Sequence, residues 1–140
     1  MQEDLKQKIL SIMEQTTIGT LASIVENKPF SRYMMFQHED VTLYTATNKH
    51  AHKVEDLRTN PDVHILLGYS GEGLSDQYLE IAAKAEVETN QDLKEKYWND
   101  SLKHWIPSAH DPAYLLLKLV PSSILLYEGA GKDPKELSLD

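Results

Sequence analysis

The stretch Thr45 to Leu57 (TATNKHAHKVEDL) places positive charge where a helix is expected to begin. Thr47 and Asn48 are residue types that favour the N-cap of a helix. The N-terminus of a helix carries partial positive charge, so acidic side chains stabilise its first turn. In this stretch the first turn holds cationic and imidazole side chains instead, namely Lys49, His50, His52 and Lys53.

A bound anion would account for this order of charges. Backbone N–H groups at a helix N-terminus already favour an anion, and Lys53, with His52 beside it, would strengthen that attraction. The alternative is a solvated charged turn, whose mismatch with the helix dipole costs only about 0.3–1 kcal/mol. A metal site at His50 and His52 is disfavoured, because side chains two residues apart on a helix do not face each other.

Arg32 is a second candidate for binding an anion. The pattern around it predicts a strand in which Arg32 shares one face with Met34 and Phe36. An arginine on an otherwise apolar face needs a partner or must extend its charged end into solvent. A phosphate is one such partner, because the guanidinium group matches its oxygens with two parallel hydrogen bonds. A salt bridge at the end of the strand is the alternative.

The other motifs do not define a catalytic centre. The run from Gly71 to Asp76 begins like a dinucleotide-binding fingerprint, but the third glycine is absent and a strand follows, so a hairpin loop is predicted. None of the six histidines falls in a catalytic or metal-ligand motif. Trp105 could belong to the core, to an interface or to the cover of a bound ring. The sequence therefore leaves the catalytic residues unassigned and predicts no metal site.

The composition limits the class of protein. The chain has 140 residues, 41% of them hydrophobic, which suits one ordinary domain with a real core. A net charge of -8 disfavours nucleic acids and anionic membranes as partners. The absence of cysteine excludes disulfides and thiol chemistry. Neither a signal-peptide core nor an apolar run of roughly 20 residues is present, so a cytoplasmic protein is expected.

Short β-branched segments separated by turn residues predict about seven strands. They are Ile18–Val25, Phe30–Gln37, Val41–Ala46, Val63–Tyr69, Tyr78–Glu88, Ala113–Val120 and Ser122–Tyr127. Tight turns at Glu26–Pro29 and His38–Asp40 indicate that the first three strands form an antiparallel meander.

Three helices are predicted around these strands. An apolar stripe marks an N-terminal helix within residues 1–15, a second helix runs from about Asn48 to Thr59, and a third begins near Thr89 and ends near Leu102. Residues 129–140 are expected to form a loose polar tail. With no repeat or linker, the sequence predicts a single domain, residues 1–140, that is mainly β with peripheral helices and forms an antiparallel barrel.

The order of several segments resembles a known family. A strand with IGTLAS precedes Arg32-Tyr33-Met34-Met35; a strand ending Leu43-Tyr44-Thr45 follows, then His52-Lys53 and Asn60-Pro61-Asp62-Val63. This order is similar to that of the pyridoxamine 5'-phosphate oxidase-like family of FMN-binding split β-barrels. The segment from Trp105 to Leu117 is similar to the general stress protein 26 branch, and the resemblance covers roughly Ile18 to Tyr127.

The resemblance implies a homodimer that binds FMN at its subunit interface, with FAD also possible. Arg32 and Lys53 would hold the phosphate. His52 stands where the larger oxidases carry an arginine, and Tyr78 where they carry a glutamine near the flavin. The full set of implied cofactor contacts is Arg32, Tyr33, Met34, Met35, Phe36, Gln37, Tyr44, Thr45, His52, Lys53, Tyr78 and Trp105.

Three functions are compatible with this resemblance. The first is a flavin-dependent oxidoreductase acting on an unknown small molecule with an unknown electron donor. The second is a stress-related protein that stores or senses flavin without turnover. The third is a relative that binds haem or a deazaflavin in the same cleft. Oxidation of vitamin B6 is not expected, because the chain ends soon after Tyr127, without the longer C-terminal substrate region of those oxidases.

Overall fold

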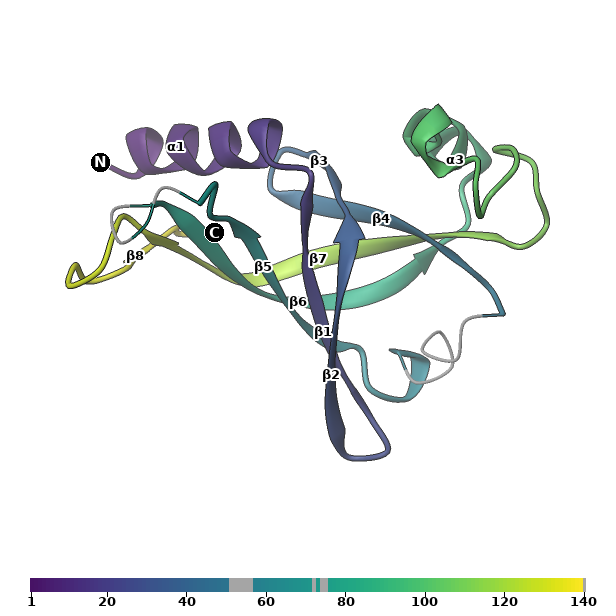
Figure 1. The fold of residues 1–140 in the computed structure, drawn as a ribbon, viewed down its shortest axis with the longest axis horizontal. Helices are drawn as coiled ribbons and strands as arrows, with labels where there is room; N and C mark the ends of the chain where they lie inside the picture. The colour runs from purple at the N-terminus through teal and green to yellow at the C-terminus, as the bar shows by residue number, and fades with distance from the viewer. Residues whose placement is uncertain (51–56, 72, 74–75, 140) are drawn as a thin grey trace.

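The computed structural model describes residues 1–50, 57–71, 73 and 76–139. One antiparallel sheet has the strand order β2-β1-β5-β6-β7-β4-β3, with β8 paired to β7 (Figure 1). Its strands are β1 (Ile18–Val25), β2 (Lys28–Met35), β3 (Gln37–Glu39), β4 (Thr42–Asn48), β5 (Asp62–Gly68), β6 (Tyr78–Glu88), β7 (Tyr114–Tyr127) and β8 (Lys135–Glu136). The helical elements are α1 (Gln2–Gln15), α3 (Gln91–Tyr97) and the 3-10 turn η1 (Asp100–Leu102), and residues 57–59 are also helical.

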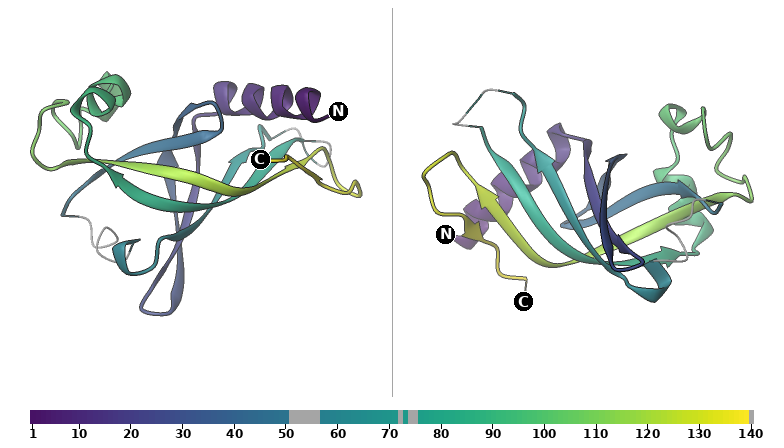
Figure 2. Two further views of the ribbon diagram at one scale, coloured as in Figure 1. Left: turned by 180° about the vertical axis from the view of Figure 1, so that it is seen from behind. Right: turned by 60° about the horizontal axis from the view of Figure 1, so that its bottom comes forward.

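The sheet curls because its two ends are joined by one residue. β2 and β3 occupy opposite ends of the strand order, yet only Phe36 lies between them. Since consecutive Cα atoms are about 3.8 Å apart, the two ends must meet there. Thr45 Oγ1 on β4 also donates a 2.8 Å hydrogen bond to the carbonyl oxygen of Met35 at the end of β2. The curl, visible in Figure 2, confirms the predicted mainly β split barrel.

Two hydrophobic clusters stabilise this sheet. The larger cluster fills the curl of the sheet and includes Leu5, Ile9 and Met13 of α1. The smaller cluster lies between α3 and the sheet, over β4 and β7; its buried members are Tyr44, Tyr97, Leu102, Ile106, Tyr114 and Leu116. Figure 1 shows α1 and α3 above the sheet, on opposite sides of the view. Among the described residues, no helix is both long and apolar enough to cross a bilayer.

Several predicted elements are confirmed. The strands predicted at Ile18–Val25 and Tyr78–Glu88 coincide with β1 and β6, and α1 lies where the N-terminal stripe predicts a helix. β5 and β6 are consecutive and pair antiparallel, which confirms the hairpin predicted between them.

The predicted meander of the first three strands is wrong. β1 and β2 form a hairpin, but the next strand, β3, crosses to the other end of the sheet, where β4 is its one partner among the described strands. The β1–β2 turn contains just Glu26 and Asn27, both in the left-handed region with φ of 51° and 64°, which matches the twist of a two-residue hairpin. Pro29 therefore belongs to β2, where a terminal strand tolerates a proline.

The two strands predicted on either side of Pro121 are a single strand, β7. The pairing of β7 with β6 shifts register between Ala82 and Ala83, so the irregularity falls beside Pro121 and the strand continues through it. The tail predicted to be loose is also ordered, because β8 pairs with β7 and Leu137 is only 4% exposed.

Two predicted helix boundaries also change. The third helix is capped by Asn90, whose Oδ1 accepts from Leu93 N at 3.1 Å, and α3 ends at Tyr97 rather than near Leu102. The second helix does not begin at Asn48, because β4 continues to that residue. Residues 51–56 of this predicted helix lie outside the described residues, and residues 57–59 are helical.

Leu137→Ala is expected to lower the free energy of unfolding by about 2–5 kcal/mol, because it leaves a cavity in the core. Leu139, 37% exposed in the same tail, is the matched control. Leu139→Ala should change stability by less than about 0.5 kcal/mol. Urea unfolding of both variants measures the difference, and equal effects would contradict a docked tail.

Candidate functional site

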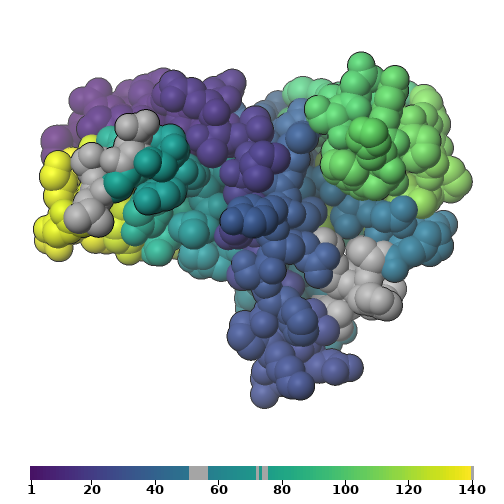
Figure 3. All heavy atoms as spheres, viewed as in Figure 1, coloured from purple at the N-terminus to yellow at the C-terminus, as the bar shows by residue number. Residues whose placement is uncertain are grey.

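A cavity of about 470 Å³ lies between β2 and β4, beyond the point where the two ends of the sheet meet. β3 pairs with β4 only at Thr42–Tyr44, so the remainder of β4 extends past β3 and faces the end of β2 across the gap. The β1–β2 hairpin also stands out from the body of the molecule on this side (Figure 3). The lining residues are Ile18, Arg32, Tyr33, Met34, Met35, Ala46, Thr47, Asn48, Leu102 and Trp105.

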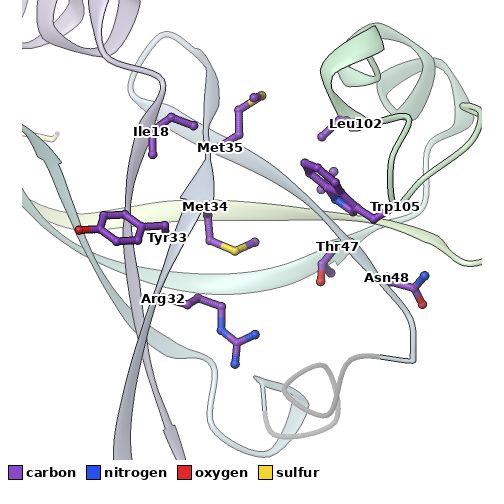
Figure 4. Close-up of a pocket in the computed structure, with 10 residues that line it drawn as sticks. Ile18, Arg32, Tyr33, Met34, Met35, Thr47, Asn48, Leu102 and Trp105 are labelled. Atoms are coloured by element: carbon purple, nitrogen blue, oxygen red, sulfur yellow. The ribbon is translucent and has the colours of Figure 1, made fainter.

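The two ends of the cavity differ in polarity. Figure 4 shows Arg32 at one end, with Thr47 and Asn48 on the opposite wall. Met35 and Leu102 lie towards the other end, with Trp105 beside them. A ligand with an anionic group at one end and an apolar ring system at the other would match both ends.

Arg32 occupies the position that the strand pattern predicts. Met34 packs against the main cluster and Phe36 is buried within it, whereas Arg32 lies further along β2 and is exposed. Arg32 makes no ion pair with any described residue. The salt bridge considered as an alternative is therefore not found among the residues that the structure describes.

Trp105 is presented by the segment that follows α3. Its side chain is 49% exposed at the cavity, and its backbone N–H donates to Leu102 O at 3.1 Å. Trp98 Nε1 donates to Ile106 O at 3.0 Å, and this bond joins the beginning of the segment to its end. Tyr114 Oη donates to Lys94 O at 2.8 Å and ties α3 to β7.

Tyr44 and Thr45 are buried and do not line the cavity. The ring of Tyr44 stacks on Tyr97, with centroids 4.4 Å apart and planes 17° from parallel. Burial, with a smaller effect of Tyr97, raises the pKa of Tyr44. The Thr45 hydroxyl is used in its bond to Met35. The next residues of β4, from Ala46 to Asn48, line the cavity instead.

Of the predicted contact residues, the structure brings together Arg32, Tyr33, Met34, Met35 and Trp105. Besides Tyr44 and Thr45, three others lie elsewhere. Phe36 is in the core, Gln37 Nε2 donates to Tyr97 O at 2.6 Å, and Tyr78 stacks on Tyr127 with a centroid distance of 4.9 Å. His52 and Lys53 are outside the described residues, so their contacts stay predictions.

Five lining residues are absent from the predicted contact set. They are Ile18, Ala46, Thr47, Asn48 and Leu102. The polar pair at 47–48 stands out in the sequence, but as a helix cap; extending the predicted strand Val41–Ala46 by two residues would have placed both of them in β4, as the structure does. Ile18 and Leu102 carry no such signal, because an apolar residue beside a cavity resembles an apolar residue in the core.

Comparisons with known proteins agree with this fold. A family model described as pyridoxamine 5'-phosphate oxidase matches residues 5–127. The chain is 42% identical over 138 residues to general stress protein 26 of Bacillus subtilis (strain 168), covering 99% of both proteins. The structure of General Stress Protein 26 from Bacillus anthracis str. Sterne is 40% identical with a TM-score of 0.86, covering 96% of this chain and 98% of the other.

A more distant structure shares the fold alone. It is a heme binding protein from Mycobacterium smegmatis, 15% identical with a TM-score of 0.77, covering 94% of this chain and 56% of the other. Fold and site together define a split-barrel protein with a cavity at its open seam. The chain belongs to the pyridoxamine 5'-phosphate oxidase family, and its similarity to general stress protein 26 confirms the branch expected from the sequence.

Tyr114→Phe is expected to reduce the loss of stability in alkali. Burial raises the pKa of Tyr114 from 10.0 to about 12, so the folded chain holds the phenol proton more tightly than the unfolded chain does. The contribution of this pKa difference to the free energy of unfolding is fully present below pH 10.0 and is lost as the pH rises through about 12. The urea midpoint of Tyr114→Phe should therefore fall less than that of the wild type across this range.

Tyr33, which is 79% exposed, gives the matched control. Tyr33→Phe should follow the wild-type pH dependence. At neutral pH, Tyr114→Phe should cost about 1 kcal/mol for its lost hydrogen bond. Parallel alkaline profiles for Tyr114→Phe and the wild type would contradict the assignment.

Proposed function

We propose that the protein binds FMN in the cavity between β2 and β4, and that the bound flavin serves an oxidoreductase reaction on a small molecule. The observation that carries this proposal is Arg32, an arginine without an ion pair to any described residue, at the polar end of a largely apolar cavity. The family membership of the chain supports the same cofactor, because flavin binding is typical of that family.

The lining residues fit the parts of FMN. The volume of about 470 Å³ lies within the roughly 300–1,000 Å³ usual for ligand sites. Arg32 would hold the phosphate with paired charge-assisted hydrogen bonds. Met35, Leu102 and Trp105 would cover the ring and exclude water from it. Lys53 and His52 are proposed as further phosphate ligands on the grounds of the sequence resemblance.

Two versions of the proposal differ in whether the bound flavin takes part in a reaction. When bound, flavin itself supplies hydride or electron transfer, and the protein binds and orients it. Reduction by NADH or NADPH, followed by reoxidation with a defined acceptor, would support the oxidoreductase. Stable binding without such turnover would favour a protein that stores or senses flavin.

A homodimer is proposed because exposed apolar side chains adjoin the cavity. Thr20 of β1 pairs with Tyr33 on one side and with Leu66 on the other, so these side chains share one face of the sheet. Tyr33 is 79%, Ile18 49% and Leu66 42% exposed. Tyr33 and Ile18 also line the cavity. A symmetric partner on this face would cover the apolar surface and bring the cavity to the interface.

Haem is a second candidate, supported by the shared fold with the heme binding protein from Mycobacterium smegmatis. A haem iron needs an axial ligand, most often histidine, cysteine, methionine or tyrosine. The described lining residues offer Met34, Met35 and Tyr33 but no histidine. The cation at the polar end of the cavity fits a phosphate better, so FMN is preferred.

Arg32→Ala is expected to weaken FMN binding by roughly 1.5–3 kcal/mol, or about 12- to 140-fold, because it removes a charge-assisted contact. Titration of the purified protein with FMN measures the change, and mass spectrometry of copurified small molecules identifies the natural ligand. Lys28, exposed at the other end of β2, is the matched control, and Lys28→Ala should bind FMN like the wild type. Unchanged FMN affinity in Arg32→Ala would remove the phosphate assignment.

Leu66→Glu is expected to convert a dimer into a monomer, because it places a charge in the proposed interface. Sedimentation at micromolar concentration measures the mass. Leu139→Glu, exposed in the C-terminal tail, should leave the dimer intact. A wild-type protein that stays monomeric while binding FMN would contradict the interface.

A further inference from the structure

Gln37 lies behind one wall of the cavity rather than along it. β3 directs its successive side chains to different helices. Gln37 Nε2 donates to Tyr97 O of α3 at 2.6 Å, whereas His38 Nε2 contacts the carboxylate of Glu14 in α1 at 2.8 Å. Gln37 is half-buried and is not one of the lining residues. Its carboxamide is therefore committed to the α3 segment.

The bond from Gln37 reaches the point where α3 ends. Tyr97 is the last residue of α3, and the carbonyl groups of the final helical turn have no partner within the helix. The ring of Tyr97 is buried against Tyr44 of β4. Gln37 thus donates a hydrogen bond to the Tyr97 carbonyl, which the end of the helix leaves without a helical partner.

Tyr97 is linked to the cavity through the next residue, Trp98. Trp98 Nε1 donates to Ile106 O at 3.0 Å, and Ile106 N donates to Leu102 O at 2.8 Å. Asn99 Oδ1 accepts from Ser101 N at 2.9 Å and caps η1. Leu102 O then accepts from Trp105 N at 3.1 Å. Leu102 and Trp105 are the two lining residues that this segment contributes. A displacement at Tyr97 would therefore be passed through Trp98 and Ile106 to the wall that they form.

We propose that Gln37 is a positioning residue, which fixes the wall bearing Leu102 and Trp105 through the Tyr97 carbonyl and so sets the affinity of the cavity for FMN. Only the second part of this proposal, the effect on FMN affinity, rests on the proposed FMN function. It also gives Gln37 a different role from the cofactor contact implied by the family resemblance, because the carboxamide acts on the protein rather than on the ligand.

Gln37→Met tests this role, because methionine has a similar length but no hydrogen-bond donor. The chain has two tryptophans, so an amide NMR spectrum shows two indole N–H signals, and Trp105→Phe assigns one of them. In FMN-free protein, Gln37→Met should move the Trp105 signal. The same variant should raise the dissociation constant of FMN about tenfold, equivalent to about 1.4 kcal/mol.

Glu39→Gln is the matched control on the same strand. Glu39 pairs with Lys96 of α3 at 3.7 Å between exposed side chains, a contact of little energetic consequence. This variant should leave the Trp105 signal and FMN affinity unchanged. Weaker FMN binding in Gln37→Met with an unmoved Trp105 signal would make Gln37 a direct contact and overturn the proposal. No change in either measurement would overturn it as well.

Gln37→Glu is a second test of the positioning role, for use if Gln37→Met does not fold. The introduced carboxylate cannot donate a hydrogen bond, but its protonated form can. The Trp105 signal should move at neutral pH and return towards its wild-type position on acidification; a signal unmoved at neutral pH would overturn the proposal. If the wild type fails to bind FMN, the proposed function fails, while the Trp105 signal of FMN-free protein still decides the positioning role.

Discussion

A single residue separates two strands that lie at opposite ends of the sheet. Phe36 is 1% exposed, and its backbone N–H donates to Thr17 O at 2.6 Å, so the junction is held in the core rather than on a flexible loop. The sheet must curl for β2 and β3 to meet at this point. The curl encloses the main hydrophobic cluster, and the Thr45 hydroxyl reinforces the junction from β4.

The same junction explains where the cavity lies. β2 and β4 are close at Met35 and Thr45, and they separate beyond that contact because no described strand joins them. The separation leaves an opening that the α3 segment covers on one side with Leu102 and Trp105. A closed barrel of this size would fill its interior with side chains. The seam therefore gives the fold space for a ligand without removing atoms from the core.

The sequence predicts local features of this molecule better than its connections. The alternation in β1 and β6, the apolar stripe of α1 and the position of Arg32 follow from residues that are neighbours in the chain. The crossing between β2 and β3 does not, because strand pairing depends on contacts between distant residues, and Phe36 reads as one more apolar residue of a strand. The prediction at Pro121 is wrong for a related reason, because a proline is expected to end a strand. β7 continues through Pro121 because its pairing with β6 is irregular there, which the local sequence does not show.

The two ends of the chain meet in space, which affects how the protein can be made. The side chain of Gln2 bonds both Glu136 O and Ser138 N, across a sequence separation of up to 136 residues, and Leu137 completes the core beside α1. During synthesis α1 can pack against β3, β5 and β6 before residues 136–138 have been made, but the bonds of Gln2 to this segment form only after it has left the ribosome. Until then the place of Leu137 in the main hydrophobic cluster stays open, and exposed apolar surface of this kind favours aggregation of an incomplete chain.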